Sequence, residues 1–299
     1  MNRKLLWGVV AVLLITNITT LLFWSQQKQI KLESGTAIDQ SEPAAVIGDR
    51  EISYDEWMTS LRENQGKAQL ETMIDYEVVR QLAKELGVSV SEKVIAREIA
   101  LLTTTQGVMT EKITKKNEKK WREDILYRYR LEALLTADVH IPEDRVKTYY
   151  DKYQNQYDFK ASTQLSHIVV PDRKTAEKVR KKLAGGSEFG KLARKYSMDE
   201  DTKQDGGYLG FFVNSSRSFP ASYMTASTDM EERTYSEPIR RDNGFAIIFV
   251  HRKLSAIEFT YDEMKPYVKR ELAMDKLDQS LSAASLWSEL DVEWVYGDE

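Results

Sequence analysis

Residues 205–212 read DGGYLGFF, so three glycines stand beside three aromatic rings within eight positions. The chain has 299 residues and only 14 glycines, and this concentration of them needs a structural reason. Glycine accepts a positive φ and lets another stretch of backbone approach closely, whereas exposed aromatic side chains usually bind a partner or pack. The stretch is therefore interpreted as either a tight corner in a core or the wall of a pocket.

The segments around this stretch alternate between helical and strand periods. The β-branched, apolar run LSHIVV at 165–170 predicts a strand, and GFAIIFVHRK at 244–253 predicts another. Between them, apolar spacing predicts three helices, over about 173–183, 189–196 and 220–230. Residues 160–254 are thus predicted to form an α+β module.

The flanks of this module are predicted to be helical. Residues 46–158 begin with a short hairpin in VIGDREIS, and a capping box of Ser53 and Glu56 then opens the first helix. Further helices are expected over about 68–86, 91–102 and 117–135, and one that starts at Pro142. The basic run at 111–120 is interpreted as a solvated loop and helix start, with membrane-surface binding as the alternative.

A second capping box, Thr260 with Glu263, opens a long helix that is predicted to reach about Glu289. This C-terminal segment, 258–299, carries one apolar stripe and has no partner helix of its own. The stripe must be buried somewhere, and the N-terminal helical segment is the expected place.

Composition excludes several classes of function. The chain carries 43 Lys and Arg against 47 Asp and Glu, a net charge of -4, so it has no surplus of positive charge for a nucleic acid backbone. It has no cysteine, which excludes disulfides, cysteine-ligated zinc and thiol catalysis. Three scattered histidines make a histidine-rich metal site a poor prediction, and no cofactor is expected.

The N-terminus predicts a membrane anchor. Residues 5–24 form an uncharged run of 20 residues directly after Arg3 and Lys4, with a tryptophan near each end. We expect residues 1–4 in the cytoplasm, a single span over 5–24, a polar linker over 25–45 and the rest of the chain outside the cell. The alternative is a cleaved signal peptide, but the apolar run is longer than is usual for one.

Four segments, LSHIVV, GGSEFGKLARKYSMD, GGYLGFF and NGFAIIFV, follow one another in the order and spacing of a known family. In these segments the module resembles the parvulin-type (PpiC-type) peptidyl-prolyl cis-trans isomerases. With its helical flanks and predicted anchor, the chain is similar to the PrsA and SurA type of secretion foldase. The resemblance implies a four-stranded antiparallel sheet surrounded by helices.

The resemblance also implies which residues form the site. His167 matches the family's histidine below the active-site floor, and Asp199 matches the position that faces the rotating peptide bond. Leu209, Phe219 and Tyr223 fall where the family places its apolar pocket for proline. These roles make the glycine stretch a turn followed by part of that pocket.

The chain departs from the family pattern in one position of the last strand. Ala246 stands where the family usually carries a second histidine, so His167 is expected to lack its usual partner. Only a few residues separate Val170 from the next helix, so no phosphate-reading loop is expected there, although Arg173 and Lys174 are basic.

Two functions follow as expectations. One is a prolyl isomerase and foldase for secreted polypeptides, and the alternative is a holdase that binds unfolded chains with a weakly active or inactive module. A module that serves only as a spacer is the third reading. The expected partners are unfolded or proline-containing polypeptides and the membrane, and the sequence leaves a homodimer through the helical flanks open.

Overall fold

The computed structural model describes residues 29–31, 37–216, 219–277 and 281–297. The predicted anchor at 5–24 lies outside this part, as do residues 25–28 and 32–36 of the predicted linker. Within the described part, no helix combines the length and the apolar character needed to span a bilayer. The chain divides into two compact units, one of residues 1–76 and 291–299 and one of residues 77–290. The predicted helical segment 46–158 therefore belongs to both units.

The smaller unit contains two antiparallel strand pairs, followed by one helix and the first part of the next. Strands β1 (Gln29–Lys31) and β2 (Ala37–Asp39) form one hairpin, and β3 (Ala45–Ile47) and β4 (Arg50–Ile52) form the other, as predicted for VIGDREIS. Helix α2 (Tyr54–Leu61) then begins because the Ser53 hydroxyl accepts from the Glu56 N–H at 3.1 Å. A π-helical turn, Arg62–Gly66, joins it to α3 (Lys67–Glu85).

Four helices of the larger unit, outside the α+β module, surround an apolar core. They are α4 (Glu92–Thr104), α5 (Glu111–Leu135), α6 (Glu143–Tyr153) and α11 (Tyr261–Leu277). The stripe of α11, with Met264, Val268 and Leu272, is buried in a cluster that also holds Val94 of α4 and Val146 of α6. The apolar stripe of α11 is therefore buried against helices α4 and α6, which precede the α+β module in the chain.

Two helix boundaries differ from the prediction. Helix α5 starts at Glu111 rather than near Asn117, because the Thr110 hydroxyl accepts from the backbone N–H of Ile113 and caps it, so most of the basic run is helical. Helix α11 ends at Leu277 rather than near Glu289. A separate 3-10 helix over Ala284–Glu289 follows, where the Ser282 hydroxyl accepts from the Ala284 N–H.

One antiparallel sheet forms the centre of the α+β module. Its strands are β5 (Ser162–Val170), β6 (Tyr208–Val213), β7 (Thr234–Tyr235), β8 (Ile239–Arg241) and β9 (Gly244–Leu254). Their order is β6-β5-β9-β7, and β8 also pairs with β9. The prediction of four strands is therefore wrong by count, because the edge next to β9 is divided into two short strands. The chain between them contains Pro238, which cannot donate to a ladder, and the Ser236 hydroxyl there accepts from the Ile248 N–H.

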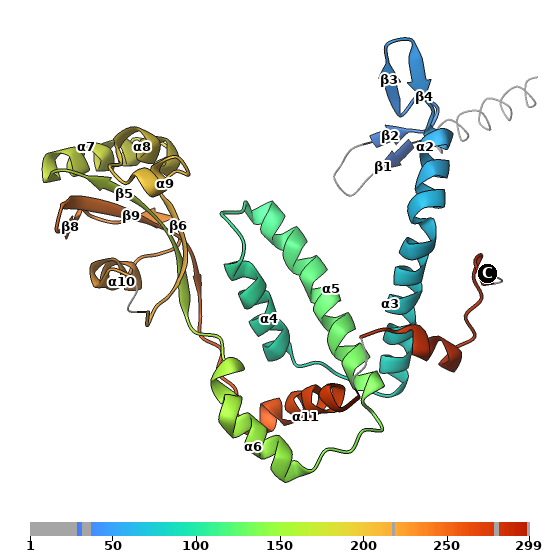
Figure 1. Ribbon diagram of the computed structural model, residues 1–299. Coiled ribbons are helices and arrows are strands. Elements are labelled where there is room, and N and C mark those ends of the chain that lie inside the picture. Colours follow the sequence, from blue (N-terminus) through green and yellow to red (C-terminus); the bar gives the residue numbers. More distant parts are fainter. Residues whose placement is uncertain (1–28, 32–36, 217–218, 278–280, 298–299) are drawn as a thin grey trace, which may run out of the picture. The chain divides into compact units, whose positions relative to one another are not determined.

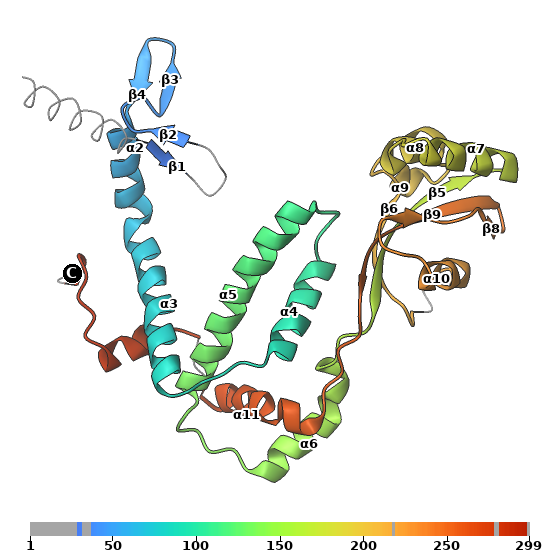
Figure 2. The same ribbon diagram turned by 180° about the vertical axis from the view of Figure 1, so that it is seen from behind.

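Helices cover both faces of this sheet, as Figures 1 and 2 show from opposite sides. Helices α7 (Arg173–Ala184) and α8 (Phe189–Tyr196) pack on Ile168, Val170 and Ile247. Helix α10 (Ala221–Thr228) packs on the other face, against a cluster that includes Leu165 and Ile248. Successive side chains of β5 point to opposite faces, and all nine of its residues are buried.

Candidate active site

His167 lies in the middle of β5, and Asp199 caps the short helix α9 (Glu200–Lys203). The Nε2 atom of His167 is 2.6 Å from Oδ2 of Asp199. The Thr202 hydroxyl lies 2.5 Å from the same carboxylate oxygen and 3.1 Å from Nε2. The Asp199 carboxylate thus accepts hydrogen bonds from both the imidazole and the hydroxyl, at distances typical of strong charge-assisted hydrogen bonds.

The other ring nitrogen of His167 has a partner too. Its Nδ1 atom lies 3.0 Å from the hydroxyl of Tyr223 on α10. The Nη1 atom of Arg241, on β8, donates to that hydroxyl oxygen at 3.2 Å. The consistent arrangement is a chain in which Arg241 donates to Tyr223, Tyr223 to Nδ1, and Nε2–H to Asp199. This order assigns the His167 tautomer from its neighbours.

The electrostatics of the site agree with this tautomer. Burial lowers the pKa of His167 and outweighs the opposite effect of the hydrogen bond to Asp199. Burial raises the pKa of Asp199, but the hydrogen bonds with Thr202 and His167 outweigh it, so this pKa lies below its usual value. Burial also raises the pKa of Tyr223 to about 12. At neutral pH the site therefore holds a neutral imidazole, an ionised carboxylate and a neutral phenol.

The glycine stretch supports His167 from the adjacent strand. Gly206 and Gly207 have φ values of 72° and 78°, so both occupy the left-handed region. The His167 N–H donates to the Gly207 carbonyl at 2.7 Å. A Cβ at Gly207 would come within 1.9 Å of the His167 carbonyl oxygen, a distance no side chain can accept. The stretch is a corner that permits close backbone approach, and its last residues form β6.

The predicted pocket residues gather in one apolar cluster. Phe219 and Tyr223 are buried in it, and Leu209 packs against it partly exposed. Phe219 meets Tyr223 edge to face at 5.5 Å and stacks on Phe212 at 3.7 Å. Tyr223 is only 1% exposed, so its ring supports the site from below and presents almost no surface of its own.

Two residues of this site were not predicted from the sequence, Thr202 and Arg241. Thr202 could have been found, because it lies three residues after Asp199 at the start of a short helix, where such pairs meet. Arg241 carried no comparable signal, whereas Phe212 belongs to the aromatic stretch at 205–212 that was interpreted as a possible pocket wall. Ala246, at the position of the expected second histidine, is fully buried on the α10 side of the sheet. His167 thus lacks the second histidine as its partner, and Tyr223 and Asp199 lie at its two ring nitrogens instead.

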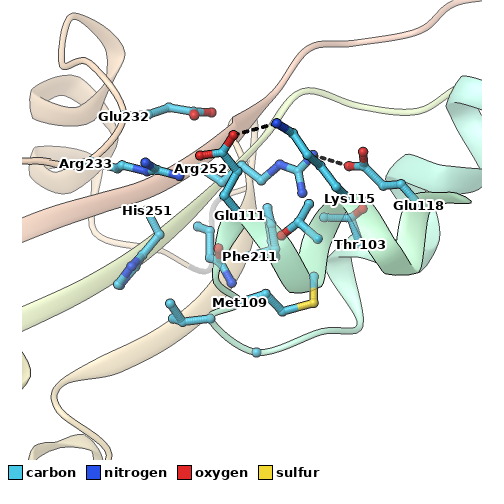
Figure 3. Close-up of a pocket in the computed structure, with 14 residues that line it drawn as sticks. Thr103, Met109, Glu111, Lys115, Glu118, Phe211, Glu232, Arg233, His251 and Arg252 are labelled. Carbon is cyan, nitrogen blue, oxygen red and sulfur yellow. Dashed lines mark hydrogen bonds and ion pairs between the residues drawn. The ribbon is translucent and has the colours of Figure 1, made fainter. Parts of the chain in front are cut away.

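The module also borders a cavity that lies away from the predicted site residues. Figure 3 shows its lining side chains. The cavity has a volume of about 320 Å³ and is lined by residues of α4, α5 and the loop between them, by β5, β6 and β9, and by Glu232 and Arg233. His251 lies in it, and its Nε2 is 2.7 Å from the Ser166 hydroxyl. The ion pair of Arg252 with Glu118, at 2.8 Å, links the sheet to α5 here. Within the described ranges, no group of His, Asp and Glu side chains is arranged to hold a metal ion.

Comparison with known proteins identifies the family. The family model described as the PPIC-type PPIASE domain matches residues 141–266. The protein YacD of Bacillus subtilis (strain 168) is 36% identical over 264 residues, which cover 88% of this chain and 89% of that protein. The chain belongs to the PpiC-type peptidyl-prolyl isomerase family. The predicted resemblance is therefore confirmed.

Further relatives of this PpiC-type chain are named as foldases. Foldase protein PrsA of Geobacillus kaustophilus (strain HTA426) is 30% identical over 246 residues, 82% of each chain. A crystal structure of PrsA from Bacillus subtilis aligns with 87% of this chain and 96% of its own, with 23% identity and a TM-score of 0.34. The PpiC-type assignment rests on the sequence relatives and the family model.

Proposed function

We infer that the protein is a peptidyl-prolyl cis-trans isomerase and foldase, which acts on secreted polypeptides at the outer side of a membrane. The observation that supports this most directly is the hydrogen-bonded chain Arg241, Tyr223, His167 and Asp199 beside an apolar cluster, within a PpiC-type domain. A rigid polar network next to an apolar wall suits a reaction that breaks and forms no covalent bond.

The reaction requires rotation about an X-Pro peptide bond. Its barrier is about 18–20 kcal/mol, and the uncatalysed exchange takes tens to hundreds of seconds. At the transition state the amide loses its resonance and its carbonyl swings out of plane. A site accelerates this step if it binds the twisted amide more tightly than the planar one. A thousandfold acceleration requires about 4 kcal/mol of such differential binding.

Each proposed residue has a role in this scheme. Leu209 and Phe219 hold the proline ring and keep water away from the amide. Asp199 is the polar group that faces the rotating bond, and it is partly exposed, with 26% of its side chain accessible. His167 is a positioning residue, because its side chain is 7% exposed and its two nitrogens are engaged by Asp199 and Tyr223.

A protease-free assay tests this function. The full chain is mixed with a proline tetrapeptide, and cis-trans exchange is followed by NMR exchange spectroscopy. The proposal requires an exchange rate above the uncatalysed one that falls in Asp199→Asn and in Leu209→Ala. A rate at background with intact peptide binding would refute the isomerase and leave a binding protein.

One observation favours a holdase as the second candidate. Ala246 is fully buried among apolar side chains, so the second histidine position of the family contributes no polar group here. A holdase would suppress aggregation of an unfolded client in proportion to its concentration, while proline exchange stayed at background. Measuring both on one sample separates the two candidates.

We also propose that residues 5–24 anchor the chain, with residues after Trp24 outside the cytoplasm. The uncharged length of the run and the positive charges of Arg3 and Lys4 before it support this orientation. Protease added outside intact cells should digest the part after residue 24. Full protection in intact cells, with digestion after lysis, would exclude this orientation.

A further inference from the structure

A cavity of about 380 Å³ opens among the helices of the larger unit, separate from the candidate active site. It is bordered by α4, α5 and α11, which are labelled in Figure 2, and by the segment around Tyr157 and Phe259. Its volume falls in the range of cavities that hold a side chain or small ligand, roughly 300–1,000 Å³. No residue of the predicted site lines it.

The charge of this helical cavity is unbalanced. Four carboxylates line it (Glu98, Glu132, Glu271 and Asp275), against two guanidinium groups, those of Arg97 and Arg128. Both guanidinium groups are already used by the same carboxylate: Arg97 pairs with Glu98, and Arg128 pairs with it at 2.8 Å. The remaining carboxylates have no positive partner from the lining.

One of these carboxylates, Glu132, lacks a direct partner for its side chain within the described ranges. It is half-buried on α5, and among the described residues no hydrogen bond or ion pair is made by its side chain. Glu271, in contrast, accepts the hydroxyls of Tyr149 and Tyr157 at 2.8 and 3.0 Å. Burial raises the pKa of Glu132, against the opposite effect of Arg128 and Arg270. Burying a carboxylate without an ion-pair partner costs free energy, and a cation that binds next to the carboxylate reduces this cost.

Arg270 acts on Glu132 through its charge, which lowers the pKa of Glu132 against the larger effect of burial. Its guanidinium lies over the Tyr267 ring at 5.3 Å, and no ion pair joins it to Glu132 in the described part of the molecule. Its Nη1 atom is buried without a hydrogen-bond partner. Glu132 lines the cavity, whereas Arg270 is not among the side chains that line it.

The lining also contains aromatic and thioether side chains. Tyr129 and Tyr267 meet edge to face at 5.4 Å, and Met264 and Met274 add flexible apolar contacts. The guanidinium of Arg128 already lies over the Tyr129 ring at 4.6 Å while it pairs with Glu98. The chain thus shows how this cavity holds a guanidinium: one aromatic face together with one carboxylate.

We propose that this cavity binds a basic side chain of an unfolded polypeptide, arginine in preference to lysine, with Glu132 as its carboxylate partner and the tyrosine and methionine side chains around its stem. The site rests on the proposed binding of unfolded clients, and it adds a selection for positive charge that is independent of proline. A planar guanidinium is preferred because it can stack and pair at once, which an ammonium cannot.

Affinity for a matched pair of peptides tests this site. A fluorescein-labelled, proline-free peptide with one arginine between leucine and alanine residues is compared with the same peptide carrying citrulline, which has the same shape and no charge. With the full-length protein, fluorescence anisotropy should give a Kd about tenfold lower for the arginine peptide, a difference of about 1.4 kcal/mol. Glu132→Gln should reduce this ratio to about one. Glu123→Gln, an exposed glutamate on the same helix, should keep it.

Several outcomes would overturn the site. They are absence of peptide binding, equal affinity of the unmodified protein for both peptides, and a preference for arginine that survives Glu132→Gln. The first two need no variant, so a folding defect cannot hide them. Proline exchange is measured on the same samples and should not change in Glu132→Gln. A missing isomerase activity with an intact arginine preference would refute the proposed isomerase and leave this site standing.

Discussion

The hydroxyl of Tyr223 lies 3.0 Å from Nδ1 of His167, on a ring whose other nitrogen meets Asp199 at 2.6 Å. The two contacts fix the orientation of the imidazole from opposite sides. They come from α10 and from the loop before α9, which are separated by more than twenty residues in the chain. The Tyr223 hydroxyl thereby supplies the second hydrogen bond to the His167 ring, which the methyl group of Ala246 cannot make.

Tyr223→Phe removes this hydrogen bond and leaves Nδ1 without a donor. We expect a loss of about 1–2 kcal/mol in the free energy of unfolding, because a buried acceptor is left unsatisfied, and about a tenfold lower kcat/KM for proline exchange. The nitrogen chemical shifts of His167 should also move from one fixed tautomer to a mixture, which a purely structural role would not produce. Tyr235→Phe on β7 is the matched control and should change none of these.

Asp199→Asn tests the other side of the ring. The hydrogen bond and the negative charge of Asp199 both raise the pKa of His167, so their loss should move the titration of His167 to lower pH. Proline exchange should fall in the same variant. The neighbouring Asp201→Asn, on the exposed side of α9, should leave both unchanged. A His167 midpoint that stays in place in Asp199→Asn would show that the two side chains are not coupled in solution.

Gly207→Ala should be among the most damaging single substitutions in the module. The added Cβ would collide with the His167 carbonyl oxygen at 1.9 Å and require a φ of 78°. We expect a loss of more than about 3 kcal/mol, since the cost of steric clash adds to that of a left-handed backbone. Gly186→Ala is the control, because Gly186 has a φ of 85° and open space around it.

Thermal unfolding followed by circular dichroism separates these two glycine effects. Gly186→Ala reports the backbone cost alone, about 1–2 kcal/mol. An equal loss in both variants would mean that β6 moves away from β5 at little cost, contrary to the contact between Gly207 and His167.

The sequence predicted the parts of the site that depend on local pattern. LSHIVV forms a buried strand because its β-branched residues suit a sheet covered on both faces, and the glycines form the corner that their spacing indicated. The resemblance to the PpiC-type family brought His167, Asp199 and Tyr223 to one place. The structure does bring these three together.

The rest depended on three-dimensional register, which local pattern does not contain. Tyr223 was expected to line the proline pocket. Its position on α10 places its hydroxyl next to Nδ1 of His167. Arg241 reaches the same hydroxyl only because β8 pairs with the start of β9, and no sequence signal marks such a short edge strand. The early start of α5, in contrast, was readable from Thr110 as a cap, but the dense charges of the basic run hid it.

Acid should weaken the module through His251. Burial lowers the pKa of this imidazole from 6.5 to about 4, so it is neutral in the folded chain at a pH where the unfolded chain binds a proton. The free energy of unfolding therefore falls as the pH drops from 6.5 toward 4 and is constant with respect to this group above 6.5. We expect a contribution of about 1–2 kcal/mol, reduced by the partial exposure of the ring.

Urea unfolding at a series of pH values measures this effect. His251→Gln should flatten the dependence between pH 7 and about 4.5, but not abolish it, because burial lowers the pKa of His167 in the same direction. His140→Gln, at an exposed position, is the control and should keep the steep dependence. If the slope of His251→Gln equals that of the unmodified protein, then His251 is not desolvated, and the packing of the α4–α5 loop over the end of the sheet differs from the arrangement in Figure 3.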